Sequence, residues 1–151
     1  MTHAPPGYAC PFCRYAAGVG NELVGPEHVV EQTPETVTFV APRAWGRCEG
    51  LLVIPTEHHE NLYDLPDGLG APLLWATRRA ALALKLAERC DGVSTRQHNE
   101  PAGNQDVWHF HTHVFPRWHG DGLYQAEPWS PERTHMAARA ERLRAAITTS
   151  M

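Results

Sequence analysis

The spacing of apolar positions predicts one long amphipathic helix in the middle of the chain. Between residues 67 and 89, leucines and alanines recur at steps of three and four. This period places them on one face of an α-helix, as a helix that packs against a sheet requires. The positions on this face are Leu69, Leu73, Ala76, Ala80, Leu84 and Ala87. We therefore expect the helix to cover a sheet with this face.

Short runs of β-favouring residues lie on both sides of the predicted helix. Three runs precede it, at residues 29–30, 37–40 and 51–54, and they are separated by prolines and glycines. Two more follow it, at residues 92–97 and 109–115. Runs of this length between turn-forming residues predict strands, and their order along the chain favours antiparallel pairing.

Further helical segments are predicted towards both ends of the chain. A short turn or helix begins at residues 10–13, and residues 61–65 form a helical turn. A second long helix covers residues 131–148, with Ser130 as its N-cap and Pro131 at its first helical position. Together the elements predict an α+β fold, in which one long helix packs on an antiparallel sheet and a C-terminal helix follows.

The composition narrows the class of protein. A chain of 151 residues, of which 42% are hydrophobic and 20% charged, predicts one globular domain. Its net charge of −4 provides no basic field for a nucleic acid polymer. It has no apolar run of about 18 residues and no signal-like N-terminus. We expect a cytoplasmic protein that does not bind membranes, with its four cysteines reduced or bound to metal.

Three histidines alternate with other residues in the last predicted strand. In a strand, His109, His111 and His113 project from one face, and the residues between them project from the other. Imidazole serves as a metal ligand, an acid–base group or a nucleophile near neutral pH. A catalytic metal held by all three is disfavoured, because they span about 13 Å on a straight strand. Metal–nitrogen bonds are only about 2 Å long. The pattern therefore indicates a functional site along this face of the strand.

These residues and several upstream motifs resemble the histidine triad superfamily. The three histidines are followed directly by Pro116-Arg117, as in the family signature. Residues 52–55 with His58 resemble its "LVIP-x-x-H" strand end, and residues 10–13 are similar to the CxxC of its zinc-containing subset. The family's "N…GQ-x-V-x-H" segment is matched by Asn99, Gln105 and Val107.

The resemblance covers most of residues 10–117 and implies a domain organisation. It predicts a HIT-like domain over residues 8–120, with residues 121–151 as a C-terminal extension whose helix packs on the same domain. Members of the family commonly pair through the long helix and a sheet edge. The resemblance therefore implies a homodimer.

The family's reaction implies that His111 attacks the α-phosphorus of a nucleotide. The activity would be that of a nucleotidyl hydrolase or transferase, with a nucleotidyl-histidine intermediate. The implied substrate is a dinucleoside polyphosphate or a nucleoside phosphoramidate. His113 would donate a hydrogen bond to the phosphate, and Gln105 would bind a non-bridging oxygen or the bridging atom of the leaving group. The other implied contacts are Asn99 at the phosphate and ribose, and Phe12 and Phe39 at the base.

Three departures from the family pattern support a second interpretation. Ala41 stands near the position of an acidic residue that usually holds the ribose hydroxyls. Asn104 replaces a glycine, and Asp106 replaces a small hydroxyl residue. The alternative function is therefore a nucleotide-binding or partner-binding module of the same fold with little or no turnover.

The resemblance also implies a structural zinc site. Carried over position by position, the ligands are Cys10, Cys13, His58 and His109, with the adjacent His59 as an alternative to His58. Four protein ligands leave no open coordination position for water, as is typical of structural zinc. The metal would fix the register of the histidine strand without taking part in the reaction.

Overall fold

The computed structural model describes residues 2–150 as a five-stranded antiparallel sheet with helices on both faces. The strands follow the order β1-β2-β4-β6-β5. Their bounds are β1 Val29–Gln32, β2 Thr36–Val40, β4 Leu51–Pro55, β5 Gly92–Gln97 and β6 Thr112–Arg117. A second, two-stranded sheet pairs β3 (Ala44–Trp45) with β7 (Pro128–Trp129). The helices are α1 (Pro11–Ala16), α2 (Gly70–Glu88) and α3 (Arg133–Ser150), with short 3-10 turns at Pro26–His28, Leu62–Asp64, Asp67–Leu69 and Pro101–Gly103.

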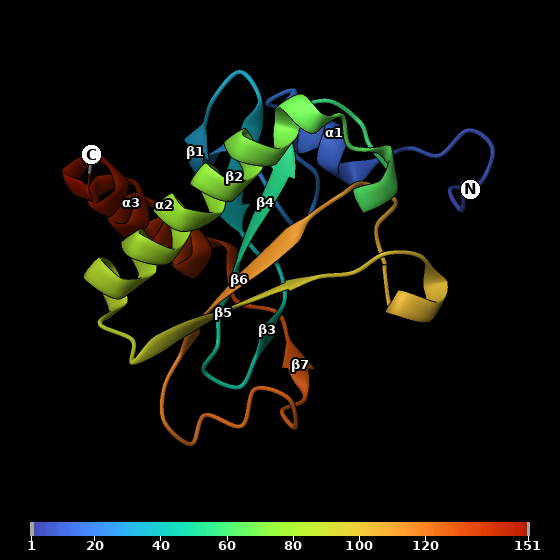
Figure 1. The fold of residues 1–151 in the computed structure, drawn as a ribbon. Coiled ribbons are helices and arrows are strands. Elements are labelled where there is room, and N and C mark those ends of the chain that lie inside the picture. Colours follow the sequence, from blue (N-terminus) through green and yellow to red (C-terminus); the bar gives the residue numbers. More distant parts are fainter. Residues whose placement is uncertain (1, 151) are drawn as a thin grey trace.

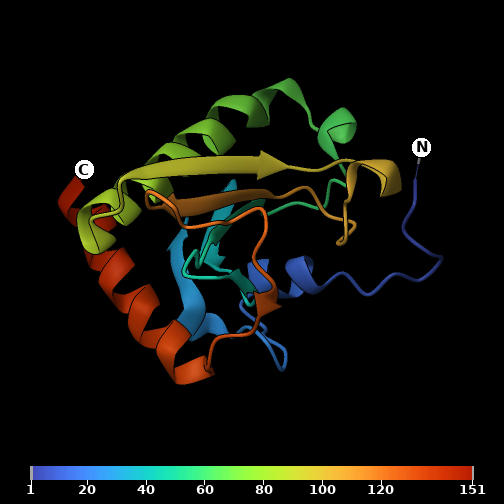
Figure 2. The same ribbon diagram turned by 90° about the horizontal axis from the view of Figure 1, so that it is seen from below.

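The main sheet is a buried layer. Figures 1 and 2 show α2 across one face, whereas α1 and the β3–β7 pair lie on the other face. Strands β2 and β4 are buried along their whole length. In β4, Leu51 and Val53 join the cluster under α2, while Leu52 and Ile54 join the cluster under α1. These layers confirm the predicted α+β fold with an antiparallel sheet, one long helix and a C-terminal helix.

Helix α2 forms where the apolar period predicted it. The predicted residues buried on its inner face are Leu73, Ala76, Ala80 and Leu84. Pro72 is tolerated because it lies in the first turn, where backbone N–H groups have no partner within the helix. Arg89 follows the helix with a left-handed backbone, at φ 52°, and turns the chain towards β5. Between residues 2 and 150, no helix combines the length and apolar character needed to cross a membrane.

The C-terminal helix begins two residues later than predicted. Helix α3 starts at Arg133, so the N-cap predicted at Ser130 and the first helical position predicted at Pro131 are wrong. The first helical hydrogen bond runs from the N–H of Met136 to the carbonyl of Glu132, at 3.0 Å. The reason lies in β7, whose pairing with β3 holds the chain extended immediately before residue 130.

Helix α3 packs on the same body as α2. Its inner face joins the cluster under α2 through Met136, Ala140, Leu143, Ala146 and Ile147. The buried Arg139 donates hydrogen bonds to the carboxylate of Glu88 in α2 and to the carbonyl of Glu49 before β4. The C-terminal segment is therefore joined to the helix layer and to the sheet by both apolar and polar contacts.

The strand that carries the histidines starts later than predicted. Strand β6 begins at Thr112, so His113 lies within the ladder whereas His111 precedes it. Strand β5 ends opposite Thr112, whereas β4 continues to Pro55 and pairs there with β2 alone. The N–H of Phe110 instead donates to the carbonyl of His59, at 2.6 Å. The alternation of faces is retained, because Phe110 is buried under α2 while His111 lines a cavity on the other side.

Candidate active site

His111 is buried beside a cavity, and one hydrogen bond fixes its ring. Its Nδ1–H donates to the carbonyl of His109 at 2.7 Å. The ring of Phe12 packs edge-on against it, with 5.2 Å between centroids. Because Nδ1 donates to a carbonyl, Nε2 is the nitrogen available for reaction. This tautomer leaves an unprotonated Nε2, the form of imidazole that nucleophilic chemistry requires.

Asp106 lies directly beside that nitrogen. Its Oδ1 is 3.4 Å from Nε2 of His111, and its side chain is mostly exposed at the cavity. The neighbouring imidazole of His111 lowers the pKa of Asp106 to about 2. The carboxylate is therefore negative at neutral pH. A phosphate that approaches Nε2 has to displace it, because the two groups repel each other and compete for the same space.

His113 supplies a second imidazole next to His111. Its ring stacks on Phe115, with centroids 5.5 Å apart and planes at 3°, and its centroid lies 5.2 Å from that of His111. Burial lowers the pKa of His113 to about 3, and the charges of His111 and Arg96 act in the same direction. The ring is therefore neutral at pH 7 and has one N–H to donate to a bound oxygen.

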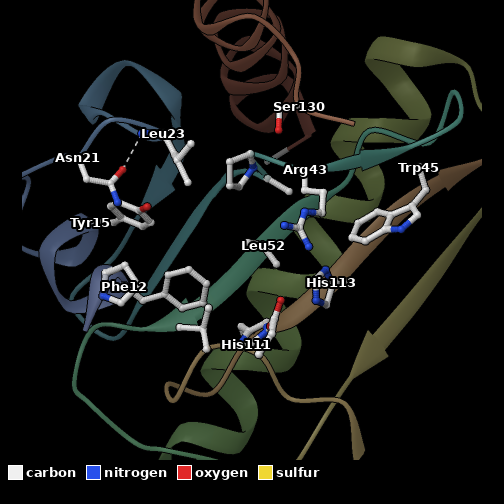
Figure 3. A pocket seen from close by; sticks show the side chains of 15 residues that line it. Phe12, Tyr15, Asn21, Leu23, Arg43, Trp45, Leu52, His111, His113 and Ser130 are labelled. Atoms are coloured by element: carbon white, nitrogen blue, oxygen red, sulfur yellow. Dashed lines mark hydrogen bonds and ion pairs between the residues drawn. The ribbon is translucent and has the colours of Figure 1, made fainter. Parts of the chain in front are cut away.

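The cavity beside the two imidazoles has a volume of about 330 Å³. This lies within the range of small-molecule pockets, about 300–1,000 Å³. Figure 3 labels Phe12, Tyr15, Asn21 and Leu23 along one wall, and Arg43 and Trp45 along the other. Ser130, from the C-terminal segment, closes a third side above the imidazoles. The cavity thus combines an apolar wall with a wall that carries an arginine.

The side-chain amide of Gln105 lies outside the cavity lining, and both its nitrogen and its oxygen are hydrogen-bonded to backbone groups. Its Nε2 donates to the carbonyls of Glu60 at 2.5 Å and Val107 at 2.9 Å. Its Oε1 accepts from the N–H of Glu100 at 2.9 Å. In this arrangement Gln105 holds the loop between β5 and β6 against the segment after β4.

Two other predicted contacts, Asn99 and Phe39, also lie outside the cavity lining. The Oδ1 of Asn99 accepts from the N–H of Leu62 at 2.8 Å, and its amide exchanges hydrogen bonds with Gln97. Phe39 is fully buried and contacts Phe12 edge-on, with 5.5 Å between centroids. The structure therefore brings Phe12, His111 and His113 together at the cavity and places Asn99 and Phe39 in supporting positions.

Several lining residues carried no signal in the sequence. Arg43 and Trp45 follow Pro42 in a short segment without periodicity, and Ser130 lies in the extension whose role the motifs did not define. Tyr15 lies on α1, beyond the CxxC motif. The pairing of β3 with β7 brings the segment around Trp45 and the C-terminal extension to the same cavity.

Two cysteines and two histidines converge about one point next to the candidate active site. The ligand atoms of Cys10, Cys13, His58 and His109 all lie within 4.8 Å of one another. The Sγ of Cys10 lies 3.3 Å from Nδ1 of His109, and the Sγ of Cys13 lies 3.3 Å from Nδ1 of His58. His109 donates from Nε2 to the carbonyl of Pro55 at 3.0 Å, which leaves Nδ1 directed at the thiols.

The donor set fits a zinc ion. Two thiolates and two imidazoles are ligands that Zn²⁺ takes in tetrahedral sites. Burial and the neighbouring Cys10 raise the pKa of Cys13 to about 12, so a pair of thiolates here calls for a nearby cation. His58 belongs to the cluster, whereas Nε2 of His59 faces the carboxylate of Glu57 at 3.8 Å. Of the two alternatives in the sequence, the geometry favours His58.

Replacing His113 with phenylalanine should reduce the loss of stability in acid. The unfolded chain takes up a proton at His113 below pH 6.5, whereas the folded chain does so only near pH 3. The native state therefore loses stability as pH falls through this window, by up to about 1.4 kcal/mol per pH unit. Urea unfolding of the wild type and His113→Phe from pH 6.5 to 4.5 should show this difference in slope. Parallel curves would contradict it.

The sequence of this chain is similar to those of known proteins over most of its length. A family model described as the HIT domain matches residues 22–120. The protein named Protein hit of Bacillus subtilis is 33% identical over 131 residues, which cover 82% of this chain and 85% of that protein. The adenosine 5'-monophosphoramidase of Saccharomyces cerevisiae is 30% identical over 111 residues, which cover 72% and 63%.

A solved structure shows the same fold. It is a zinc-bound histidine triad family protein from Mycobacterium smegmatis, with a TM-score of 0.76 and 26% identity, and the match covers 94% of this chain and 95% of that one. The matched family model spans the main sheet, α2 and all three histidines. The chain therefore belongs to the HIT domain family.

Proposed function

We propose that the protein is a nucleotidyl hydrolase or transferase in which Nε2 of His111 attacks the α-phosphorus of a nucleotide. The observation that carries the proposal is the hydrogen bond from Nδ1 of His111 to the carbonyl of His109, which leaves Nε2 at the cavity. Family membership supports a nucleotide substrate. The name of the yeast relative, an adenosine 5'-monophosphoramidase, supports a nucleoside phosphoramidate, and the sequence motifs add dinucleoside polyphosphates to the substrate class.

The reaction proceeds by two displacements at phosphorus. In the first, Nε2 of His111 forms a bond to the α-phosphorus, and the bond to the leaving group breaks, with its electron pair remaining on that group. In the second, a water or alcohol oxygen attacks the same phosphorus and releases its proton to solvent, while the bond to His111 breaks and its electron pair returns to Nε2. The neutral His113 donates its N–H to a phosphate oxygen and stabilises the charge that develops in both steps.

The nucleoside lies in the apolar part of the cavity in this proposal. Phe12 contributes an aromatic face beside His111, and Phe39 supports Phe12 from behind. Gln105 and Asn99 hold the loop that carries Asp106, through hydrogen bonds that fix its two ends. Direct contacts of Gln105 and Asn99 with the phosphate remain predictions from the sequence motifs.

The position of Asp106 favours one alternative function. Its negative carboxylate lies beside Nε2 of His111, at the place where an α-phosphate has to arrive. A protein that keeps the carboxylate there would bind a nucleoside in the apolar cavity without transferring its phosphate. The alternative is therefore a nucleotide-binding module with little or no turnover.

The covalent intermediate provides the direct test of the proposed reaction. Wild-type protein mixed with adenosine 5'-phosphoramidate or diadenosine tetraphosphate, and quenched in alkaline denaturant, should carry a covalently bound AMP unit detectable by mass spectrometry. His111→Ala should abolish the adduct and product release, because it removes the nucleophile. His119→Ala, on the exposed turn after β6, is the matched control and should retain both.

The same samples distinguish the alternative function. Calorimetric titration with AMP that shows binding, together with no adduct and no product from either substrate, would favour the binding module. Unchanged turnover in His111→Ala would refute the assignment of the nucleophile.

We also propose that Cys10, Cys13, His58 and His109 hold a structural zinc ion. The convergence of their ligand atoms and the zinc-bound Mycobacterium smegmatis structure support this site. Cys10 and Cys13 lie at the start of α1, His58 follows β4, and His109 precedes β6. These residues would tie three separate segments together and so hold the His109 carbonyl in place for His111.

Metal analysis tests the ligand set. Cys13→Ser should be purified without zinc and should unfold at a lower temperature, because the site loses a ligand and its three segments are no longer joined. His59→Ala is the matched control and should retain zinc and the wild-type melting temperature. Zinc that remains in Cys13→Ser, or that is lost in His111→Ala, would contradict a structural site of this composition.

We further propose that two copies of the chain pair through α2 and the β5 edge of the sheet. Exposed apolar side chains on α2 are Leu74, Trp75, Leu82 and Leu86. Strand β5 is the last strand of the main sheet, so one side of its backbone is free to pair. An apolar helix face next to an open edge is a surface that a second copy can cover.

Light scattering during gel filtration measures the mass of the assembly directly. The wild type should elute as a dimer, and Leu82→Glu should elute as a monomer, because it places a charge in the proposed interface. Val19→Glu, at another exposed apolar position, is the control and should remain dimeric. A monomeric wild type at micromolar concentration would contradict the proposal.

A further inference from the structure

A second cavity extends the candidate active site beyond His113. Its volume is about 240 Å³, and its lining residues are Trp45, Arg96, His98, Asn104, Asp106 and His113. Trp45, Asp106 and His113 also line the larger cavity. The two spaces therefore meet at the imidazole that would contact the phosphate, with the apolar wall of α1 on one side and the end of β5 on the other.

Arg96 is the cation of this second cavity, and aromatic rings position it. It pairs with His113 across β5 and β6, so it is next to the phosphate-contacting residue in the sheet. Its guanidinium carbon lies 4.7 Å from the ring centroid of Phe115, 5.6 Å from that of Trp45 and 5.7 Å from that of Tyr124. Such contacts hold a guanidinium in place without using its hydrogen-bond donors.

Those donors have no partner among residues 2–150. Within this range the side chain of Arg96 makes no hydrogen bond or ion pair, and its Nε is a buried donor without an acceptor. The neighbouring Arg117 is different, because its Nε and Nη2 both donate to the carboxylate of Asp121. An ordered guanidinium whose charge is not balanced by a carboxylate is a site for a phosphate or another anion.

The rest of the lining is consistent with a polar, anionic occupant. The Nδ1–H of His98 donates to the carbonyl of Gly103 at 2.6 Å, which leaves its Nε2 free to contact a ligand. The ring of His98 lies 6.0 Å from that of His113. Asp106 is the one carboxylate in the lining, and its Oδ1 faces His111. A phosphate that reaches His111 displaces this carboxylate from the reacting nitrogen.

We propose that this second cavity receives the negatively charged leaving group, a phosphate chain attached to the α-phosphate, and that Arg96 binds it. This inference rests on the proposed function and deepens it, because it assigns the leaving-group side of the substrate. Arg96 offsets the negative charge that grows on the leaving phosphate as its bond to the α-phosphorus breaks. A neutral amine leaving group gains nothing from Arg96. Arg96 thus determines specificity for the leaving group.

Two substrates with the same nucleotidyl group test this directly. Diadenosine tetraphosphate has an anionic leaving group, and adenosine 5'-phosphoramidate has an amine. Arg96→Gln should lower kcat/KM for the tetraphosphate by about tenfold to a hundredfold, as expected for the loss of a charged hydrogen-bond partner. For the phosphoramidate, kcat/KM should change by less than about threefold, the size of effect expected for an uncharged contact.

Two further variants separate binding of the leaving group from support of the fold. Arg96→Lys keeps the charge and should recover part of the lost activity with the tetraphosphate. Arg47→Gln removes an arginine that is likewise stacked on a ring, 4.0 Å from the centroid of Trp118, but lies outside both cavities, and it should leave both substrates unchanged. Equal losses on the two substrates in Arg96→Gln, or no loss on either, would overturn the proposal.

Direct binding distinguishes this inference from the proposed reaction. Inorganic tripolyphosphate should bind the wild type in calorimetry, at least about tenfold more weakly in Arg96→Gln, and unchanged in Arg47→Gln. If the wild type forms no covalent adduct but the three proteins bind tripolyphosphate as expected, the proposed reaction is refuted and the anion site is still supported. If tripolyphosphate does not bind, or binds Arg96→Gln equally well, the anion site is refuted whatever the turnover.

Discussion

The candidate site depends on how the backbone and ring of His109 are held. Its Nε2–H donates to the carbonyl of Pro55, and its Nδ1 faces the thiols of Cys10 and Cys13. Its carbonyl in turn accepts the hydrogen bond that orients His111. The ring is completely buried, so loss of either hydrogen bond would leave polar groups without water to replace their partners. One residue therefore couples the cysteine cluster to the ring of His111.

The segment after residue 120 shapes the site although it carries no chemical motif. Strand β7 pairs with β3 and so supports the segment that places Trp45 between the two cavities. Ser130 closes one side of the larger cavity, and Tyr124 lies near the guanidinium of Arg96. The family model ends at residue 120, whereas the cavity wall continues beyond it. Residues outside the matched domain therefore help to shape the candidate site.

Local pattern predicted most of the fold, and errors arose where distant segments interact. Helix α2 and its buried face follow from a period of three and four, which depends only on neighbours in the sequence. Strand β6 was predicted from residue 109, but its pairing stops at Thr112, because β5 ends there and Phe110 bonds to His59 instead. Helix α3 begins at Arg133 rather than Pro131 because the pairing of β7 with β3 keeps the preceding residues extended. Neither β3 nor β7 was predicted, since each has two residues.

The sequence alone determined the chemistry that is available: the alternating histidines, the CxxC pair and the family to which they belong. Spacing within one short segment is a local property, and it placed His111 and His113 on the same side of the chain. Only the tertiary structure decided which polar groups remain free. In this structure the side-chain amide of Gln105 is hydrogen-bonded to backbone groups. The guanidinium of Arg96 has no hydrogen-bond partner among the described residues. Such competition for partners depends on segments far apart in sequence, so no local pattern could reveal it.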